Sequence, residues 1–263
     1  MLLQDKIAVI TGIGPGMGRE TALLFARNGA SLAIGARTQR VLQSVAREVE
    51  ALGGQVIAQV TDLADRDSCQ ALVRAAVQRF GGVDVLVQNG HHAGDWKSVE
   101  DADPAFWHHM MDVNLFGALH LFQAVLPSMK ERHDGRIVLI NSGASNNRAP
   151  SGLSAYAASK AAMGALVRSI ALECGKYGIR CNGVHLGMVD GPNLAPWIAA
   201  EARRAGKSVA EFLEGWYDDR LPLRHIPPPD ECAGTVLYLA SDLARPVTGQ
   251  AISVNGGEWF GVR

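Results

Sequence analysis

Two residues that could transfer a proton, Tyr156 and Lys160, stand four positions apart in the stretch SAYAASKAAMGALVRSIALE. On a helix, residues at this spacing share one face. A lysine ammonium held beside a phenol favours the phenolate, so we expect Lys160 to lower the pKa of Tyr156 from about 10 toward neutrality. The pair therefore predicts a proton donor and acceptor that works near neutral pH.

A glycine-rich turn, TGIGPGMG, lies between the first apolar run of the chain and the first helical pattern. Glycine at these positions lets the backbone approach a pyrophosphate closely, and the N-terminus of the helix supplies amide donors. The alternative is a tight turn that merely needs glycine. We expect a dinucleotide to contact Gly12, Gly14, Gly16, Met17 and Gly18. Together with the Tyr–Lys pair, this turn predicts an oxidoreductase.

The second apolar run ends at Gly35-Ala36-Arg37, a place where dinucleotide sites distinguish between their two cofactors. An acidic residue there would bond the ribose diol, whereas an arginine can bind a 2′-phosphate. Ala36 and Arg37 therefore favour NADP(H). NAD(H) remains the alternative for two reasons. Arginine is often simply solvated at a protein surface, and Pro15 offers no second basic contact to the phosphate.

The composition of the chain favours one globular enzyme domain over residues 1–263. Apolar residues make up 48% of it, enough for a sizeable core. A net charge of −1 gives no reason to expect nucleic acid or a membrane surface as a partner. The N-terminal MLLQDKIAVITG predicts a strand rather than a signal peptide. Scattered cysteines favour a reducing cytoplasm over zinc or disulfides: Cys69, Cys174, Cys181 and Cys232.

Short apolar runs alternate with helical patterns along the chain. Strands this apolar, separated by helices, predict a single doubly wound parallel α/β sheet, Rossmann-like, with helices on both faces. The expected strands are 7–11, 31–36, 55–60, 83–89, 136–141, 180–186 and 251–255, and the expected helices are 19–28, 39–52, 67–80, 104–132, 154–177 and 230–241. Asp190–Pro229 breaks this rhythm, and its helical middle, Ala199–Tyr217, predicts an inserted substrate lid.

In this order and spacing, the motifs resemble those of the short-chain dehydrogenase/reductase family over nearly the full chain. TGIGPGMG resembles the family's TGxxxGxG turn, and TGQAISVNGG resembles its last strand. The family's catalytic Asn-Ser-Tyr-Lys set is matched by Asn114 in DVNLFG, Ser142 in RIVLINSG, Tyr156 and Lys160. The resemblance implies further cofactor contacts from Asp62 in TDLAD, Leu63, Asn89 and Val189, in addition to Arg37, Tyr156 and Lys160.

The resemblance also implies a role for each catalytic residue. Tyr156 would transfer a proton to or from the substrate oxygen while hydride moves between substrate and nicotinamide. Ser142 would hydrogen-bond the same oxygen, and Lys160 would hold the nicotinamide ribose. Asn114 lies within a helical pattern although Asn is a poor helix former, which favours a helix distortion that holds a water for proton relay. The alternative for Asn114 is a buried polar residue satisfied by backbone.

One turn departs from the family pattern. The family's NNAG sequence is Gln88-Asn89-Gly90-His91 here, so an imidazole replaces a glycine close to the expected path of the cofactor. His91, His92 and His185 have no carboxylate or thiol partner at a matching spacing. They therefore favour hydrogen-bonded pocket histidines over a metal site, and we expect no metal.

Several residues near the expected lid could contact a substrate: His92, Trp96, Met188 and Trp197. They could equally pack the lid onto the body of the protein. We expect hydride transfer between NADP(H) and a bulky, apolar secondary alcohol or ketone, whether alicyclic, aromatic or steroid-like. The alternatives are an NAD(H)-dependent relative, a nucleotide-binding regulatory or scaffold protein without turnover, and an epimerase or dehydratase. Family resemblance and apolar residues on the two longest helical patterns predict a homo-oligomer, a tetramer.

Overall fold

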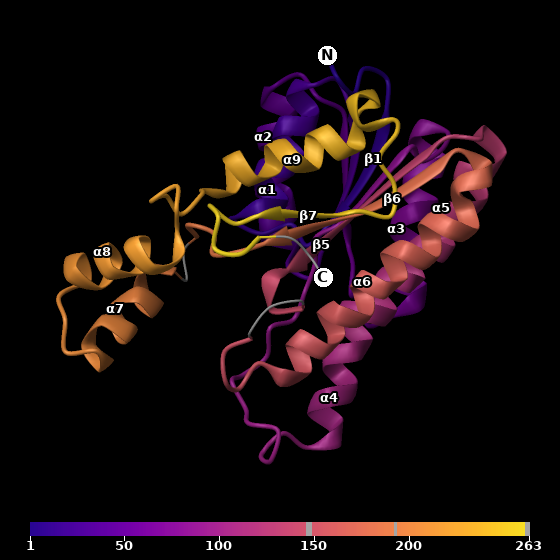
Figure 1. Ribbon diagram of the computed structural model, residues 1–263. Coiled ribbons are helices and arrows are strands. Elements are labelled where there is room, and N and C mark those ends of the chain that lie inside the picture. Colours follow the sequence, from indigo (N-terminus) through magenta and orange to yellow (C-terminus); the bar gives the residue numbers. More distant parts are fainter. Residues whose placement is uncertain (146–148, 192–193, 261–263) are drawn as a thin grey trace.

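Seven parallel strands form one sheet in the order β3-β2-β1-β4-β5-β6-β7 (Figure 1). The computed structural model describes residues 1–145, 149–191 and 194–260. The strands are β1 (Ile7–Thr11), β2 (Ser31–Ala36), β3 (Val56–Val60), β4 (Val85–Gln88), β5 (Gly135–Ser142), β6 (Ile179–Leu186) and β7 (Ala251–Val254). The chain starts in the middle of the sheet, runs to one edge and then to the other, so the strand order reverses between β1 and β4. The doubly wound sheet predicted from the sequence is confirmed.

Alternate side chains of each strand pack into two separate apolar layers. On β1, Ala8 and Ile10 belong to one buried cluster and Val9 to the other. Helices α1 (Met17–Arg27), α2 (Gln39–Ala51) and α9 (Pro229–Ala240) cover the first cluster, and α3 (Arg66–Phe80), α5 (Gly117–Arg132) and α6 (Ser154–Cys174) cover the second (Figure 1). Both faces of the sheet are therefore buried, which is why its strands are apolar at nearly every position.

The region predicted as one helix, residues 104–132, changes helix type along its length. Helix α4 (Pro104–Met111) passes into a π-helical turn, η1 (Asp112–Phe116), before α5 begins. The N–H of Gly117 bonds the carbonyl of Asp112, one residue further back than in an α-helix. The helix distortion expected around Asn114 is thus confirmed.

Among the helices that the structure describes, none is both long and apolar enough to cross a membrane.

Two helices, α7 (Leu194–Arg204) and α8 (Val209–Arg220), occupy the segment expected to form a lid. The prediction of one helical middle over residues 199–217 is wrong. Gly206 takes a φ of +66°, which ends the first helix in a left-handed turn. Ser208 and Glu211 then form a capping box that begins α8.

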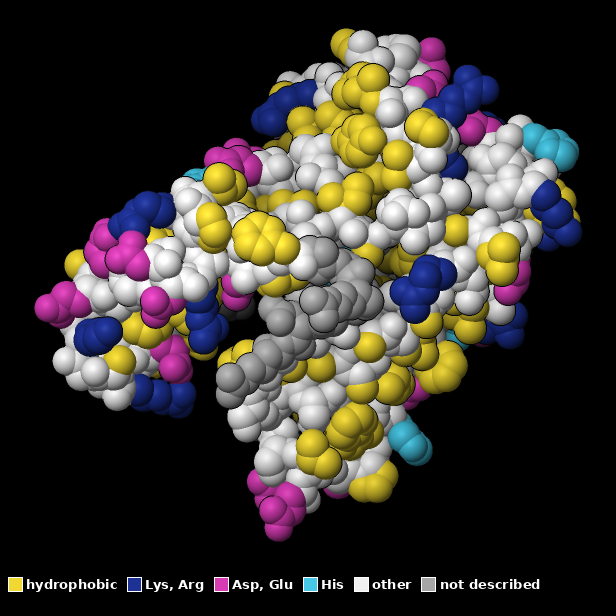
Figure 2. Space-filling view, in the orientation of Figure 1, with side chains coloured by type: hydrophobic (Ala, Val, Ile, Leu, Met, Phe, Trp, Pro, Cys, Tyr) yellow, Lys and Arg dark blue, Asp and Glu magenta, His cyan; other side chains and the backbone are white. Residues whose placement is uncertain are grey.

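Helices α7 and α8 have a small aromatic core of their own. The ring centres of Trp197 and Trp216 lie 5.6 Å apart, and Phe212 lies 6.5 Å from Trp197 and 5.9 Å from Trp216. The strongest contacts of the two helices are with each other rather than with the sheet. In Figure 1 and Figure 2 they stand apart at the left of the molecule. We call this unit the α7–α8 hairpin.

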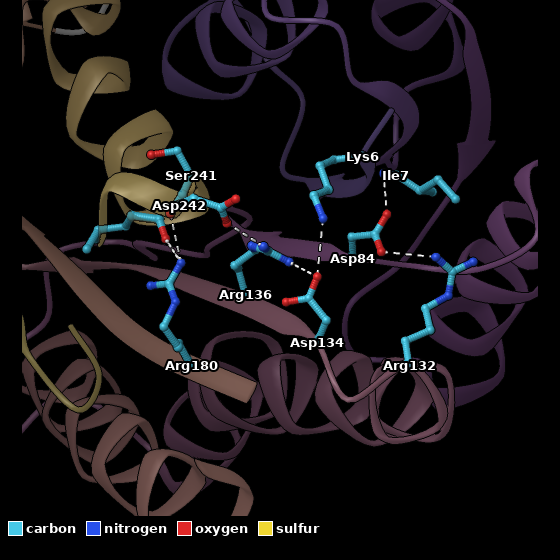
Figure 3. Close-up of polar contacts among 10 residues, drawn as sticks. Lys6, Ile7, Asp84, Arg132, Asp134, Arg136, Arg180, Ser241 and Asp242 are labelled. Carbon is cyan, nitrogen blue, oxygen red and sulfur yellow. Dashed lines mark hydrogen bonds and ion pairs between the residues drawn. The ribbon is translucent and has the colours of Figure 1, made fainter. Parts of the chain in front are cut away.

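Ion pairs hold the amino ends of the central strands together (Figure 3). Asp84, just before β4, accepts from the first amide of β1 at 2.8 Å and from Arg132 at 3.1 Å. Arg136, on β5 and only 7% exposed, binds Asp134 and lies 2.7 Å from Asp242. These groups lie at the edge of the sheet where the strands begin. The opposite, carboxyl edge is left for a ligand site.

Candidate active site

A cavity of about 580 Å³ opens at the carboxyl ends of the strands. It includes the point where the strand order reverses, which is where doubly wound sheets bind ligands. Ser142, Tyr156 and Lys160 line it, whereas Asn114 is fully buried and does not. Every residue predicted to contact the cofactor also lines it: Gly12, Gly14, Gly16, Met17, Gly18, Arg37, Asp62, Leu63, Asn89, Tyr156, Lys160 and Val189. The structure therefore brings the predicted residues together in one place.

The glycine turn forms a close-packed cradle at one end of the cavity. Gly12 has a φ of +71°, and a Cβ there would lie 2.3 Å from the backbone of Gly90. A Cβ on Gly18 would lie 2.3 Å from the carbonyl oxygen of Gly12. Asn89 Nδ2 donates to that same carbonyl at 2.8 Å, tying β4 to the turn. A backbone this tightly packed, opening onto the N-terminus of α1, fits a pyrophosphate.

Arg37 and Asp62 lie exposed on the lining of the cavity. Arg37 directly follows β2, and no acidic residue stands beside it at the end of that strand. Asp62 follows β3, and its Oδ1 accepts from the N–H of Ala64 at 3.0 Å. A cation after β2 and a carboxylate after β3 are suitably placed for the phosphate and adenine parts of a dinucleotide.

Tyr156, on α6, lies beside Ser142, at the end of β5, close enough for the Ser142 hydroxyl to affect the phenol. Burial raises the pKa of Tyr156, and the Ser142 hydroxyl opposes that rise without cancelling it. Lys160 Nζ lies 5.8 Å from the centre of the phenol ring. The lowered pKa that the sequence predicts for Tyr156 is therefore wrong, because exclusion of water from the phenol is the largest cause and raises the pKa.

Lys160 is 2% exposed, an unusual degree of burial for a lysine. Its Nζ donates to the carbonyl of Ile140 at 2.8 Å, and its own carbonyl accepts from Asn141 Nδ2 at 3.0 Å. Burial lowers the pKa of Lys160 to about 7. A group with this pKa can both give and take a proton at neutral pH.

Asn114 uses its side chain to hold the altered turn after β4. Its Oδ1 accepts from the N–H of His92 at 2.7 Å, and its Nδ2 donates to the His92 carbonyl at 2.9 Å and to Ser159 Oγ at 2.9 Å. The buried side chain is thus satisfied by the backbone of His92 and by Ser159, and the proton relay expected at Asn114 stays a prediction. Asn114 thereby joins the π-helical turn, the 89–92 turn and α6.

The imidazole of His91 faces Tyr156 inside the cavity. The ring centres are 6.3 Å apart, edge to face, and Nδ1 lies 3.5 Å from the carbonyl of Asn89. The surrounding protein and, to a smaller extent, Lys160 lower the pKa of His91 to about 4. His91 is therefore neutral at neutral pH. Among the residues that the structure describes, no three His, Cys, Asp or Glu side chains gather as metal ligands would.

The predicted substrate residues do not share one location. His92 lines the cavity, with its ring centre 4.9 Å from that of His109. Trp96 is 54% exposed, and Met188 lies outside the cavity lining. Trp197 packs inside the α7–α8 hairpin and does not line the cavity, so its contacts there join the two helices to each other rather than to the body.

The chain after β7 approaches Ser142, which sequence reasoning missed. A Cβ on Gly143 would lie 2.0 Å from Cη2 of Trp259, so the indole lies directly against the backbone next to Ser142. Trp259 Nε1 donates to Ser253 Oγ at 3.2 Å, and Asn255 Nδ2 donates to the Trp259 carbonyl at 3.0 Å. The only sequence signal was a tryptophan shortly after the last expected strand.

Comparison with known proteins agrees with the geometry. A family model for short chain dehydrogenases matches residues 6–202. The L-rhamnose 1-dehydrogenase (NAD(P)(+)) of Azotobacter vinelandii is 37% identical over 98% of both chains. The 7alpha-hydroxysteroid dehydrogenase of Escherichia coli is 33% identical over 97% of this chain and 94% of its own. The crystal structure of levodione reductase, 28% identical, superposes with a TM-score of 0.87 over 97% of this chain and 98% of that one. The chain therefore belongs to the short-chain dehydrogenase/reductase family and is an NAD(P)-dependent oxidoreductase that acts on CH–OH or C=O groups.

Proposed function

We propose that this protein is an NADP(H)-preferring alcohol dehydrogenase or ketoreductase. The observation that carries the proposal is that Ser142, Tyr156 and the buried Lys160 line the cavity that also contains the glycine turn. Proton transfer and dinucleotide binding would thus take place in one cavity. The same cavity makes a purely regulatory or scaffold role a weaker alternative, since binding alone needs no such proton donor.

The proton-transferring groups act on one substrate oxygen. In ketone reduction Tyr156 gives its proton to the carbonyl oxygen, and in the reverse direction it removes that proton. Ser142 donates a hydrogen bond to the same oxygen and stabilises the charge that develops there. A bound nicotinamide supplies or accepts the hydride. The raised pKa of Tyr156 keeps the phenol protonated at neutral pH, which suits a proton donor.

Lys160 and Asn114 support this transfer. With a pKa of about 7, Lys160 can return a proton to the phenolate of Tyr156. It is also placed on the cavity lining to bind the ribose hydroxyls of the cofactor. Asn114 positions the 89–92 turn through its bonds to His92, and the π-helical turn around it is where we place the proton path to Lys160.

The preference for NADP(H) is supported by Arg37 and by the small Ala36 beside it. Arg37 lies exposed at the cavity, available to a 2′-phosphate, while Ala36 provides no carboxylate to repel one. Pro15 lines the cavity without adding a charge, so we expect a modest preference. The alternative is NAD(H), and the name of the rhamnose dehydrogenase relative includes both cofactors.

We further propose a bulky, apolar secondary alcohol or ketone as substrate. Leu194, at the start of α7, lines the cavity, so the α7–α8 hairpin is placed to act as a lid over it. The name of the hydroxysteroid dehydrogenase relative supports a substrate of this size. The name of the rhamnose dehydrogenase relative supports a sugar instead.

The test is an assay of NADPH and NADH oxidation with steroid, aromatic, alicyclic and sugar-derived carbonyl compounds. Oxidation that depends on a carbonyl compound and is lost in Tyr156→Phe is the expected result. Tyr177→Phe is the matched control, because Tyr177 contacts Lys130 and His133 on the surface instead of lining the cavity. Tight cofactor binding without turnover of any compound would favour a scaffold. Conversion of substrate without net cofactor oxidation would favour an epimerase or dehydratase.

We also propose a homotetramer that works in the cytoplasm. Support for self-association comes from apolar side chains that remain exposed, such as Leu172 at 86% and Leu243 at 63%. Support for a reducing compartment comes from four cysteines that are free thiols. Light scattering at micromolar concentration tests the oligomer, and a monomer would contradict it.

A further inference from the structure

The direction in which Ser142 donates is limited by the turn that follows it. Ser142 ends β5, and the 3₁₀ turn η2 (Gly143–Ser145) comes directly after. The N–H of Ala144 donates to Ser142 Oγ at 3.2 Å. That bond occupies one lone pair of Ser142 Oγ and leaves the hydroxyl proton for another acceptor, with Tyr156 close by. The shape of the turn therefore limits the orientations open to the hydroxyl.

His185 holds this turn from the neighbouring strand. It lies on β6 opposite Asn141 and is 1% exposed. Its Nδ1 lies 3.3 Å from Ser145 Oγ, and Ser145 Oγ donates to the Ser142 carbonyl at 2.7 Å. A hydroxyl has one proton, and that of Ser145 is used in the second bond, so Nδ1 of His185 must be the donor in the first. Two hydrogen bonds thus connect His185 to the backbone of Ser142.

The surroundings of His185 keep its imidazole neutral and fixed in place. Burial, followed by the charges of Lys160 and Arg168, lowers the pKa of His185 to about 4, although the nearby polar backbone of Ser142 opposes this. Gly183, two residues earlier on the same face of β6, leaves room for the ring. A Cβ on Gly183 would lie 3.2 Å from His185 Nε2. At neutral pH the ring is an uncharged donor with one orientation.

We propose that His185 is a positioning residue whose Nδ1–H holds Ser145 and thereby aims the hydroxyl of Ser142 at the substrate oxygen. This rests on the proposed function of Ser142, since it explains how that hydroxyl is directed. The imidazole itself does not line the cavity in which we place substrate and cofactor. Its removal should therefore slow the reaction without weakening binding, because a misaimed donor is lost mainly in the transition state.

Substitutions at two positions separate the hydrogen bond from the space that the ring fills. His185→Phe keeps a ring without the donor and should lower kcat roughly ten- to hundredfold, with the substrate KM and cofactor Kd nearly unchanged. Ser145→Ala removes the hydroxyl that links His185 to the Ser142 carbonyl and should lower kcat by a similar factor. His185→Asn keeps a donor close to the Nδ1 position and should recover most of the rate. Equal losses in His185→Phe and His185→Asn would reveal a packing role and overturn the proposal.

A double-mutant cycle tests whether His185 acts through Ser142. Ser142→Ala removes the hydroxyl that is aimed, so adding His185→Phe to it should change kcat less than about twofold. Additive losses would overturn the proposal. Asn182→Ala is the matched control, because Asn182 is equally buried on β6 and bonds Val247 and Gln250 instead. It should lower Tm and leave kcat within about twofold.

The tautomer of His185 gives a readout that needs no turnover. Nitrogen-15 NMR of the wild-type protein should show His185 protonated at Nδ1, and Ser145→Ala should shift that nitrogen while the other histidines keep their shifts. Protonation at Nε2 in the wild type would overturn the hydrogen-bond chain, whatever the activity. If no carbonyl compound were reduced at all, the proposed function of the site would fail. The tautomer of His185 would still show whether the hydrogen bonds from His185 through Ser145 to Ser142 form.

Discussion

Gly143→Ala should destabilise the protein through one specific contact, that with Trp259. The new Cβ would lie 2.0, 2.4 and 2.6 Å from three carbons of the indole, Cη2, Cζ2 and Cζ3. Carbon atoms normally approach to about 3.5 Å, so the ring must retreat by about 1.5 Å. A flat, rigid ring cannot turn aside as the end of a flexible side chain would. The turn after Ser142 or the chain after β7 has to move.

The magnitude follows from the bonds that hold Trp259. Displacing the ring strains or breaks the bond from Nε1 to Ser253 Oγ, worth about 1 kcal/mol. Overpacking of a tight site typically adds about 1–3 kcal/mol. A total of about 2–4 kcal/mol should lower Tm by roughly 2–4 °C for each kcal/mol. Because Gly143 adjoins Ser142, kcat should fall as well.

Thermal unfolding and the ketone assay together measure this effect. In a Trp259→Ala background, Gly143→Ala should cost less than about 0.5 kcal/mol, because the obstructing ring is gone. Gly234→Ala, on α9, is the control: a Cβ there meets nothing within 4 Å, so it should be neutral or stabilising by up to about 1 kcal/mol. An unchanged Tm for Gly143→Ala, or an equal loss in both backgrounds, would refute the reasoning.

Four further outcomes are expected. Tyr156→Phe should keep cofactor affinity but lose about a hundredfold or more in kcat, and retention of more than about a tenth would remove Tyr156 from proton transfer. Ala36→Asp combined with Arg37→Ile should reverse cofactor choice in kcat/KM, from a roughly tenfold preference for NADP(H), and a wild type that prefers NAD(H) would show that Arg37 points into solvent. Burial opposes ionisation of Asp134, but Arg136 outweighs burial and holds the pKa of Asp134 below its usual value. The ion pair therefore stabilises the fold above about pH 4, and this stabilisation is lost as the pH falls further. Urea midpoints measured across this range should fall less steeply with decreasing pH in Arg136→Met than in the wild type. Hydrogen exchange at the base of the α7–α8 hairpin should slow on adding cofactor plus substrate, and unchanged exchange would argue against a lid.

The parts of the fold that the sequence predicts well are those determined locally. The residue types of β1 and of the glycine turn after it follow directly from their local structure. Both faces of the strand are buried, which requires apolar residues, and Gly12 has a positive φ, which favours glycine. The break between α7 and α8 was also readable, since Ser208 and Glu211 have the spacing of a capping box just after Gly206. The expectation of one continuous helix over residues 199–217 does not take this signal into account.

The parts that sequence did not predict depend on contacts between distant segments. An asparagine within a helical pattern, as at Asn114, predicts a helix distortion. It does not predict that the side chain of Asn114 bonds the backbone of His92. The pKa of Tyr156 depends on how much protein surrounds the phenol, which the spacing to Lys160 does not contain. The approach of Trp259 to Gly143 joins the last residues of the chain to the middle of the sheet, and no local pattern encodes it.

The internal aromatic core of the α7–α8 hairpin has an evolutionary consequence. Trp197, Phe212 and Trp216 pack on one another, and the helices that carry them have their main contacts with each other. Such a unit can be exchanged between relatives as a cassette, with the donor's own aromatic contacts carried along. Recognition of new substrates could then arise by replacement of this one segment, while the cofactor site and the seven strands remain under their original constraints.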